Sequence, residues 1–534
     1  MRSSITSSAG WPYLLVTIIW IVTRAYPLSQ AQPWACWEVA EVKKLLEYGF
    51  GERQGAIINI HFMTGIMPDP WKFNYVNHPY PILWLDTFIY WLGGSWAVLI
   101  LTSLLGLLTC LAVIPALQCC FSHREAGIGA SLYTLAPAAI LFDADTNIVA
   151  LGAIVWPISI YLIGKSARQK WPIAAALLGG TVFVAGQVSW FTYTVLPVLL
   201  IATAGLALNP AGRLIVKPNT KLLIAVIAGG LLTLVVFALQ IWLYTYNFAD
   251  TLSYVHGQAS AEQGATLPRM YLAIAMRSVL SIGPVLVLGA LGGFFVLVRN
   301  RSMNWLQLGA ILYPFCFVTA ALVLPRFFYR ERTMYGYLVF PCTVLTLTAL
   351  QNSRSKRVTA ATLCLTALGL TYPALQASIP KVSETSRKLG SYIHGISQPD
   401  EVVVTNLQQQ QWPFQPWDVG SITNVCLVAD RALRESISNT TSLEALLQNF
   451  RTRQLNVVFL YDTGKPIDES LHAFLKAAAR PEFARFETPT EPVSTATRLR
   501  SFYWQIAGKH RSLAEGTRPA NIEEFEVFRF KLSK

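Results

Sequence analysis

The sequence predicts a polytopic α-helical membrane protein that carries a small α/β domain at its C-terminal end. Of its 534 residues, 53% are hydrophobic and 13% are charged, and the mean hydropathy is +0.42. These values lie outside the range of ordinary soluble domains. Several apolar stretches approach or exceed the roughly 20 residues that a helix needs to cross a bilayer. After Pro380 the composition becomes that of a soluble protein, so we expect a membrane domain over residues 1–379 and a soluble domain over residues 380–534.

Most of the net charge of +13 belongs to the membrane domain. The residues after Pro380 contain 19 Lys and Arg against 17 Asp and Glu, which leaves 23 against 12 for the rest of the chain. Short basic loops on the cytoplasmic side of a membrane explain such an excess. We therefore expect membrane lipids, and no nucleic acid, among the partners.

The positions of the basic loops predict the topology. An apolar run over residues 11–22 gives the first helix. Residues 80–92 are apolar too, but this segment is short for a span, and we interpret it as interfacial or re-entrant. With this choice the loops that carry most of the Lys and Arg residues fall on one side, which the positive-inside rule makes the cytoplasm. The prediction is about 11 transmembrane helices, with the N-terminus inside, the C-terminal domain outside, and later spans near residues 95–120, 127–142, 147–164, 171–187, 191–208, 221–246, 270–298, 303–324, 333–350 and 357–377.

The soluble domain shows the pattern of a mixed α/β fold. Residues 401–405 and 456–461 read as buried strands, and residues 525–530 alternate like a further strand. Thr441 and Glu444 have the spacing of a capping box at the start of a helix. We expect this domain to be extracytoplasmic.

A long polar loop, residues 25–94, follows the first helix. Within it, apolar residues recur at helical spacing over residues 38–48, which predicts an interfacial helix before the second such helix at 80–92. In the predicted topology three other polar elements share the outer face with this loop. Because four polar elements far apart in sequence converge there, we expect the functional site on that face. The other three are residues 143–147, 247–269 and 325–332.

Two pairs of acids lie in these outer elements. Glu38 and Glu41 are three residues apart, so on a helix both carboxylates lie on one face, where they suit a general base or a divalent cation site. The alternative is the solvated face of an interfacial helix. Asp143 and Asp145 lie at a helix end, where the plain alternative is a cap stabilised by the helix dipole.

Basic residues complete the candidate site. His78 stands between Asn77 and Pro79, either as a substrate-binding residue or as a hydrogen-bonded structural one. Three arginines beside aromatic residues occupy a side of the membrane where the positive-inside rule disfavours them. They suit a phosphate or pyrophosphate on a lipid, and the alternative is a snorkelling cluster paired with Glu331. These arginines are Arg326, Arg330 and Arg332.

The layout resembles that of the GT-C glycosyltransferases, in particular the branch that contains the protein O-mannosyltransferases and the lipid A aminoarabinose transferase. The resemblance covers nearly the whole membrane domain, although its motifs are short. The matching elements are the single N-terminal helix, a large first outer loop with an interfacial helix from Trp37-Glu38 to Gly49, a second one that starts at His78-Pro79-Tyr80-Pro81, the helix-end acid Asp145, and the arginine-rich element that leads into Tyr337-Leu-Val-Phe-Pro341.

This resemblance implies transfer of a sugar from a polyprenyl-phosphate or dolichyl-phosphate carrier to an acceptor on the outer face of the plasma (inner) membrane. An acid of the first loop would deprotonate the acceptor hydroxyl, and the lipid phosphate would leave, neutralised by arginine or by a divalent cation. The family usually has Asp-Glu at the start of the first interfacial helix, where this chain has Trp37-Glu38. That departure leaves the base open between Glu38, expected first, and Glu41, with Asp145 as the second acid. Asp143, His78 and the three arginines would bind substrate.

Two other functions stay open at this point. A transporter or flippase of a lipid-linked or anionic substrate would carry polar residues at mid-membrane depth and often shows internal repeats. The acids of this chain cluster at one surface and no repeat is visible, which favours the enzyme. A non-catalytic assembly subunit with the same fold is the third hypothesis. The absence of GxGxxG, P-loop and Gly-x-Ser-x-Gly motifs argues against a nucleotide-driven pump or a familiar hydrolase.

Overall fold

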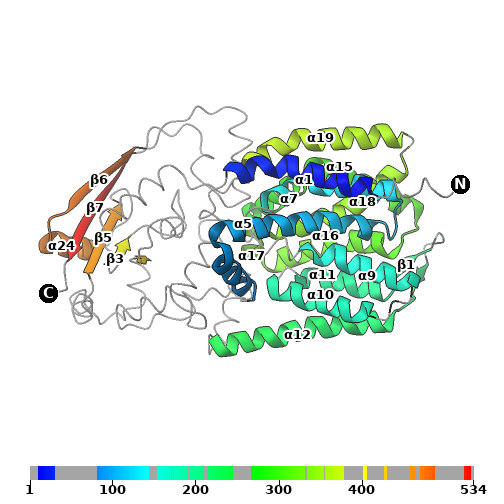
Figure 1. Cartoon of the computed structure of the whole chain (residues 1–534), viewed down its shortest axis with the longest axis horizontal. Coiled ribbons are helices and arrows are strands. Elements are labelled where there is room, and N and C mark those ends of the chain that lie inside the picture. The colour runs from blue at the N-terminus through cyan, green and yellow to red at the C-terminus, as the bar shows by residue number, and fades with distance from the viewer. Residues whose placement is uncertain are drawn as a thin grey trace.

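The computed structural model contains one helical bundle and one mixed sheet, which lie at opposite ends of the molecule in Figure 1. Helix α1 begins at the end of the bundle away from the sheet. The structure describes residues 10–30, 81–142, 153–169, 171, 173–189, 192–209, 211, 213–244, 266–330, 333–353, 355–377, 401–405, 426–429, 456–462, 469–487 and 522–530.

The helices of the bundle follow the apolar segments of the sequence. Four of the described helices are long and apolar enough to cross a bilayer, and a bent pair of helices makes a fifth. The chain is therefore a multi-pass membrane protein, whereas the total of 11 helices stays a prediction. The helices are α1 (Trp11–Gln30), α5 (Pro81–Leu117), α6 (His123–Thr134), α7 (Pro137–Phe142), α9 (Val155–Gln169), α10 (Ala174–Val188), α11 (Thr192–Thr203), α12 (Thr220–Tyr244), α14 (Leu267–Ile282), α15 (Pro284–Asn300), α16 (Trp305–Val323), α17 (Pro325–Arg330), the 3-10 helix η2 (Thr333–Leu338), α18 (Val339–Gln351) and α19 (Lys356–Ala377).

Helix α5 is divided where the sequence predicts that a short segment ends and a span begins. Gly93 and Gly94 leave the helical conformation, and Gly94 has a φ of 67°, a region that favours glycine. The division separates the segment of residues 81–92 from the long helix that follows. In Figure 1 the first part of α5 turns away from the rest of the helix at the end of the bundle that faces the sheet.

Two expected spans are interrupted. The span expected at 270–298 consists of α14 and α15, which meet at an angle of 97°. Gly283 joins them with a φ of 88° and Pro284 starts the second helix, so a straight helix cannot continue through this point. The span expected at 127–142 is likewise split, because Pro137 lacks the N–H that would continue α6.

Close helix packing builds the core of the bundle. At Gly293 of α15, a Cβ atom would lie only 1.9 Å from the Leu345 carbonyl oxygen, so this helix touches the backbone of α18. The Thr346 hydroxyl donates to the Leu286 carbonyl across the same contact at 3.2 Å. Further in, the indole of Trp156 stacks on Phe340 and meets Tyr313 edge-on. Small residues at helix contacts are typical of membrane bundles, where backbones approach closely.

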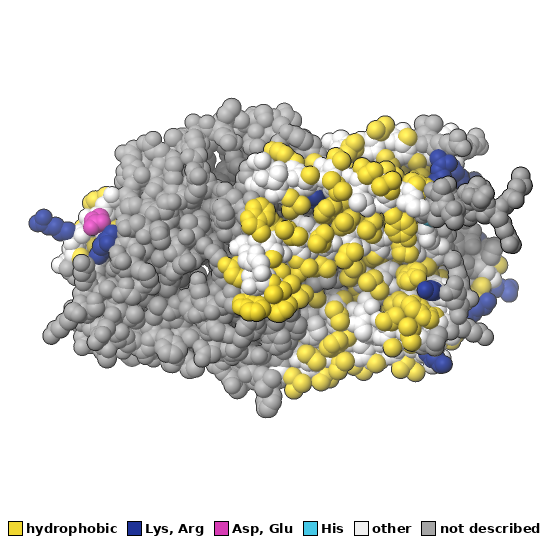
Figure 2. Space-filling model, viewed as in Figure 1, with side chains coloured by type: hydrophobic (Ala, Val, Ile, Leu, Met, Phe, Trp, Pro, Cys, Tyr) yellow, Lys and Arg dark blue, Asp and Glu magenta, His cyan; other side chains and the backbone are white. Residues whose placement is uncertain are grey.

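The basic loops gather at one end of the bundle. The hairpin of β1 (Ala207–Leu208) and β2 (Leu214–Ile215) carries Arg213 and bridges to Met303, two residues after Arg301. Gln351 at the end of α18 donates to Glu125 at the start of α6, at 3.1 Å. Figure 2 shows Lys and Arg side chains at the end of the bundle away from the sheet, beyond a broad apolar flank. The loops that the sequence assigns to one side of the membrane are thus neighbours.

A five-stranded mixed sheet lies in the C-terminal part of the chain. Its order is β4-β3-β5-β7-β6, with β3 parallel to β4 and β5, and β7 antiparallel to β5 and β6. The strands expected at 401–405, 456–461 and 525–530 are present as β3, β5 and β7, whereas the domain boundary at residue 380 stays a prediction. The bounds are β3 (Glu401–Thr405), β4 (Cys426–Ala429), β5 (Asn456–Asp462), β6 (Glu482–Glu487) and β7 (Ile522–Phe530), and α24 (Glu469–Ala478) packs against the sheet.

Candidate active site

The helices next to several predicted outer elements pack together. Helix α14, which follows the loop expected at 247–269, packs against α17, η2 and α7. The hydroxyl of Tyr271 in α14 donates to the carbonyl of Leu322 at 3.3 Å, so the start of α14 lies beside the end of α16. Helix α7 ends at Phe142, one residue before Asp143. The helices that lead into or out of three of the four elements on which the site prediction depends therefore pack on one another.

Aromatic packing anchors α17, the short helix that carries Arg326. The ring of Phe328 is buried and meets the ring of Phe317 edge-on, with centroids 4.9 Å apart. The hydroxyl of Tyr335 in η2 donates to the Phe328 carbonyl at 2.8 Å. At 100° per residue, Arg326 lies on the other side of this helix from Phe328. The guanidinium is therefore carried by a backbone segment that is fixed on both sides, as an anion-binding arginine requires.

The short segment of α5 presents aromatic side chains outward and one acid inward. Phe88 and Trp91 are exposed, and Trp91 is 73% exposed. Aromatic residues of this kind prefer the membrane–water interface. Asp86, two residues before Phe88, is fully buried. The sequence patterns above do not predict Asp86 as a site residue, although a lone acid in an apolar segment is itself a signal for a functional residue.

A second buried charge lies in α1. Arg24 is 1% exposed, and its Nη1 atom donates to the Thr23 hydroxyl at 2.6 Å and to the Thr134 carbonyl of α6 at 2.9 Å. This residue was also missed from the sequence, where it stands at the end of the first apolar run. An arginine inside a membrane helix could have been flagged on the same ground as Asp86.

Most of the predicted site residues lie outside the part of the chain that the structure describes. For Arg330 the structure gives the backbone position at the end of α17, and Arg326 is partly buried in the same helix. The structure thus places the helices next to the candidate acids, and the roles of the individual side chains stay predictions. The residues outside the described part are Glu38, Glu41, His78, Asp143, Asp145 and Arg332.

Among the described residues, no metal cluster competes with this region. There, no group of three or more His, Cys, Asp or Glu side chains is placed to hold a metal ion. A small apolar crevice is lined by Trp156, Val198 and Trp305, among others. Its lining is almost wholly apolar, so it offers little to orient a polar substrate.

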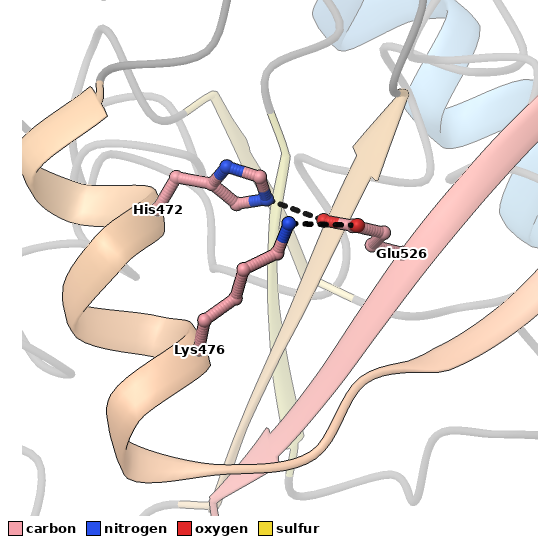
Figure 3. A network of polar contacts seen from close by, with 3 residues as sticks. All are labelled: His472, Lys476 and Glu526. Carbon is pink, nitrogen blue, oxygen red and sulfur yellow. Dashed lines mark hydrogen bonds and ion pairs between the residues drawn. The ribbon is translucent and has the colours of Figure 1, made fainter.

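A polar cluster joins α24 to the sheet (Figure 3). His472 and Lys476, one turn apart on α24, both reach the carboxylate of Glu526 on β7, and the Lys476 Nζ atom lies 3.2 Å from it. Burial raises the pKa of Glu526, but the hydrogen bonds and charges of His472 and Lys476 outweigh this effect and lower it below the usual value. Since the carboxylate is satisfied by both partners, we interpret the cluster as an attachment of the helix to the sheet.

Comparison with known proteins tests the fold. A scan against protein-family models gives no match, and a search of curated proteins gives none either. Solved structures do match. The crystal structure of ArnT from Cupriavidus metallidurans bound to undecaprenyl phosphate has a TM-score of 0.58 and 10% identity, and the match covers 99% of this chain and 100% of that one.

Two further solved structures also match this chain. The apo form of the same ArnT has a TM-score of 0.56 and 12% identity over 89% of this chain and 96% of that one. The oligosaccharyltransferase from Archaeoglobus fulgidus in its apo form has a TM-score of 0.51 and 11% identity over 85% of this chain and 70% of that one. The chain has the GT-C fold. The fold resemblance inferred from the sequence is thereby confirmed, and at these identities it speaks for the fold alone.

Proposed function

We propose that this GT-C-like protein is a membrane glycosyltransferase that moves a sugar from a polyprenyl-phosphate carrier to an acceptor hydroxyl on the outer face of the membrane. The observation that carries the proposal is the packing of α7, α14, α17 and η2 at one end of a bundle that matches ArnT over its full length. The crystal structure of that ArnT contains undecaprenyl phosphate. The polar elements predicted on the outer face adjoin these helices in sequence, which supports the same end of the bundle as the site.

The proposed reaction is a displacement at the anomeric carbon of the carrier-bound sugar. Glu38, or Glu41 in its place, takes the proton of the acceptor hydroxyl, and the hydroxyl oxygen forms a bond to the anomeric carbon. The bond from that carbon to the phosphate oxygen breaks, and its electron pair stays on the departing lipid phosphate. Asp145 serves as the second acid. General acid–base help of this kind contributes about 10²- to 10⁴-fold in rate.

Arginine would stabilise the phosphate as charge develops on it. Arg326 is the best-supported member of the proposed clamp, because α17 is held by Phe328 and Tyr335 in a fixed position. A guanidinium binds phosphate oxygens with two parallel N–H donors, a geometry that lysine lacks. Arg330 and Arg332 extend the clamp, while Asp143 and His78 contact the sugar or the acceptor. A divalent cation would serve the same purpose as the arginines.

Transfer from a panel of polyprenyl-phosphate sugars by the purified protein in lipid nanodiscs tests the proposal. We expect Glu38→Gln and Asp145→Asn each to lower kcat by about 100-fold or more while the protein stays monodisperse. Glu482→Gln, which changes an exposed acid on β6, is the control and should stay within about twofold of wild type. If both site variants kept full turnover, the assignment of the acids would be wrong.

A further inference from the structure

Arg24 is a charged side chain buried inside the first membrane helix. Only 1% of its surface is exposed, and its Nη1 atom reaches the Thr134 carbonyl, 110 residues away in sequence and on another helix. An ionisable residue at such a position is costly to keep, and it marks a functional site more often than a packing site. The contact with Thr134 ties α1 to the end of α6.

Thr134 is the last residue of α6, directly before the chain turns into α7. Because Pro137 has no N–H, the Tyr133 carbonyl lacks its usual donor and accepts instead from the Ala136 N–H at 3.1 Å. Carbonyls in the last turn of a helix have no donor within their own helix, and a cation near them is favoured by the helix dipole. Arg24 supplies both a donor and a positive charge at this end, so it caps α6 from α1.

This contact joins two helices that precede the candidate acids in sequence. Helix α1 ends at Gln30, upstream of Glu38 in the same loop, and α7 ends at Phe142, directly before Asp143 and Asp145. Most of α7 is buried, with Ala138, Ile140 and Leu141 at 1% exposure or less, so its direction is set by its packing and by the way α6 ends. Arg24 is therefore placed to hold α1 and the start of α7 in one relative position.

We propose that Arg24 is a positioning residue: through the end of α6 it fixes the direction of α7, the helix that leads to Asp143 and Asp145 in sequence, relative to α1, the helix that leads to Glu38. The catalytic part of this inference rests on the proposed function. A catalytic group displaced by about 1 Å costs on the order of 100-fold in rate without weakening substrate binding to the same degree. Loss of Arg24 should then lower kcat and leave the KM for the lipid donor nearly unchanged.

Hydrogen exchange of the full-length protein tests the structural part without any assay of activity. In Arg24→Met we expect the amides of residues 138–142 to exchange at least tenfold faster, while those of α18 keep the wild-type rate and show that the bundle is folded. In Arg24→Lys the ammonium still reaches the Thr134 carbonyl, so exchange should stay within about threefold of wild type. Arg299→Met, which removes an exposed charge in the last turn of α15, is the matched control and should change neither segment.

If Arg24→Met does not fold, a less disruptive variant tests the same contact. Thr23→Val removes the other acceptor of the same Nη1 atom and should raise the exchange of residues 138–142 about threefold. Unchanged exchange at these residues in every Arg24 and Thr23 variant that folds would overturn the positioning role.

Kinetics of sugar transfer then test the link to catalysis. We expect kcat to fall about 10- to 100-fold in Arg24→Met and the donor KM to stay within about threefold. Faster exchange at residues 138–142 together with wild-type kcat would overturn the catalytic part. If the wild-type protein transferred no sugar from any donor, the proposed function would fail, and the exchange data would still decide whether Arg24 holds α7.

Discussion

Glu526 shows how a single carboxylate attaches an element in this protein. Its side chain is 7% exposed and is reached by His472 and by Lys476 from the same face of α24. Hydrogen bonds to a buried charged group stabilise by about 1.5–3 kcal/mol, more than an exposed ion pair does. The pKa of Glu526 lies below the value of about 4.5 expected for the unfolded chain, because these two partners outweigh the effect of burial.

The lowered pKa predicts how the attachment depends on pH. A group whose pKa is lower in the folded state stabilises that state at pH values above its unfolded pKa, and this contribution is lost as the pH falls through the folded pKa. We expect Glu526→Gln to destabilise the α24–β7 contact by about 1–3 kcal/mol at pH 7 and by less below about pH 4. Protection factors of the β7 amides, corrected for intrinsic exchange, measure this difference.

The neighbouring Glu482 offers a control for that experiment. It lies on β6 with an exposed side chain, 3.7 Å from the Arg529 Nε atom. Exposed pairs of this kind contribute little, so Glu482→Gln should change the same protection factors by less than about 0.5 kcal/mol. A pH-independent effect of Glu526→Gln would contradict the role of the ionised carboxylate.

Single residues were the part of the site that the sequence predicted least well. Arg24 and Asp86 are buried charges in apolar segments, and hydropathy averaged over a window does not reveal one such residue. Their significance depends on the helix that lies opposite, as with Thr134 for Arg24. Glu38 and Asp145 were found instead by their place in a polar element and by the family resemblance, and their roles stay predictions.

At the scale of elements, helix breaks decide where the site lies. Hydropathy predicts that residues 270–298 are helical, but it does not predict the 97° turn that sets α14 against α17. The turn depends on Gly283, whose φ of 88° is open mainly to glycine, and on its contact with Pro137, where a Cβ atom would come within 3.0 Å of the proline Cδ. A local sequence pattern does not reveal such contacts between segments that are distant in sequence.

Gly283→Ala tests this account of the turn. The substitution forces a strained backbone conformation and a contact with α7, so we expect a loss of about 1–3 kcal/mol. Gly292→Ala, further along α15, is the matched control, because its new Cβ would make only an ordinary contact of 3.6 Å with Ala349. Thermal unfolding in detergent should show a lower midpoint for the first variant alone. Equal midpoints for both variants would mean that Gly283 is not required for the bend.

At the scale of the whole molecule, charge predicts the arrangement of the bundle. The loops assigned to the cytoplasm by their Lys and Arg residues are neighbours at one end, and the helices that flank the outer elements meet at another place, beside α17. The positions of the Lys and Arg residues in the sequence are enough to predict which loops lie together, because a basic loop is disfavoured on the outer side of the membrane. The number of spans and the side of the sheet stay predictions, since they depend on segments outside the described residues.

Labelling of single cysteines tests the predicted orientation. In a cysteine-free background, a membrane-impermeant maleimide should label Glu482→Cys on β6 in intact cells, because the C-terminal domain is expected outside. It should label Ser302→Cys, between α15 and α16, only after the membrane is permeabilised. The reverse pattern would invert the topology and place the arginines of α17 on the cytoplasmic side.

The central claim is that this bundle transfers a sugar from a polyprenyl-phosphate carrier. Its most direct test is to measure, in one reaction, the glycosylated acceptor and the polyprenyl phosphate released by wild-type protein and by Glu38→Gln and Arg326→Gln variants. The account predicts equal amounts of the two products with the wild type, a loss of about 100-fold or more in kcat for Glu38→Gln, and a weaker donor interaction for Arg326→Gln. Release of neither product from any polyprenyl-phosphate sugar, with the protein folded and in lipid, would contradict it.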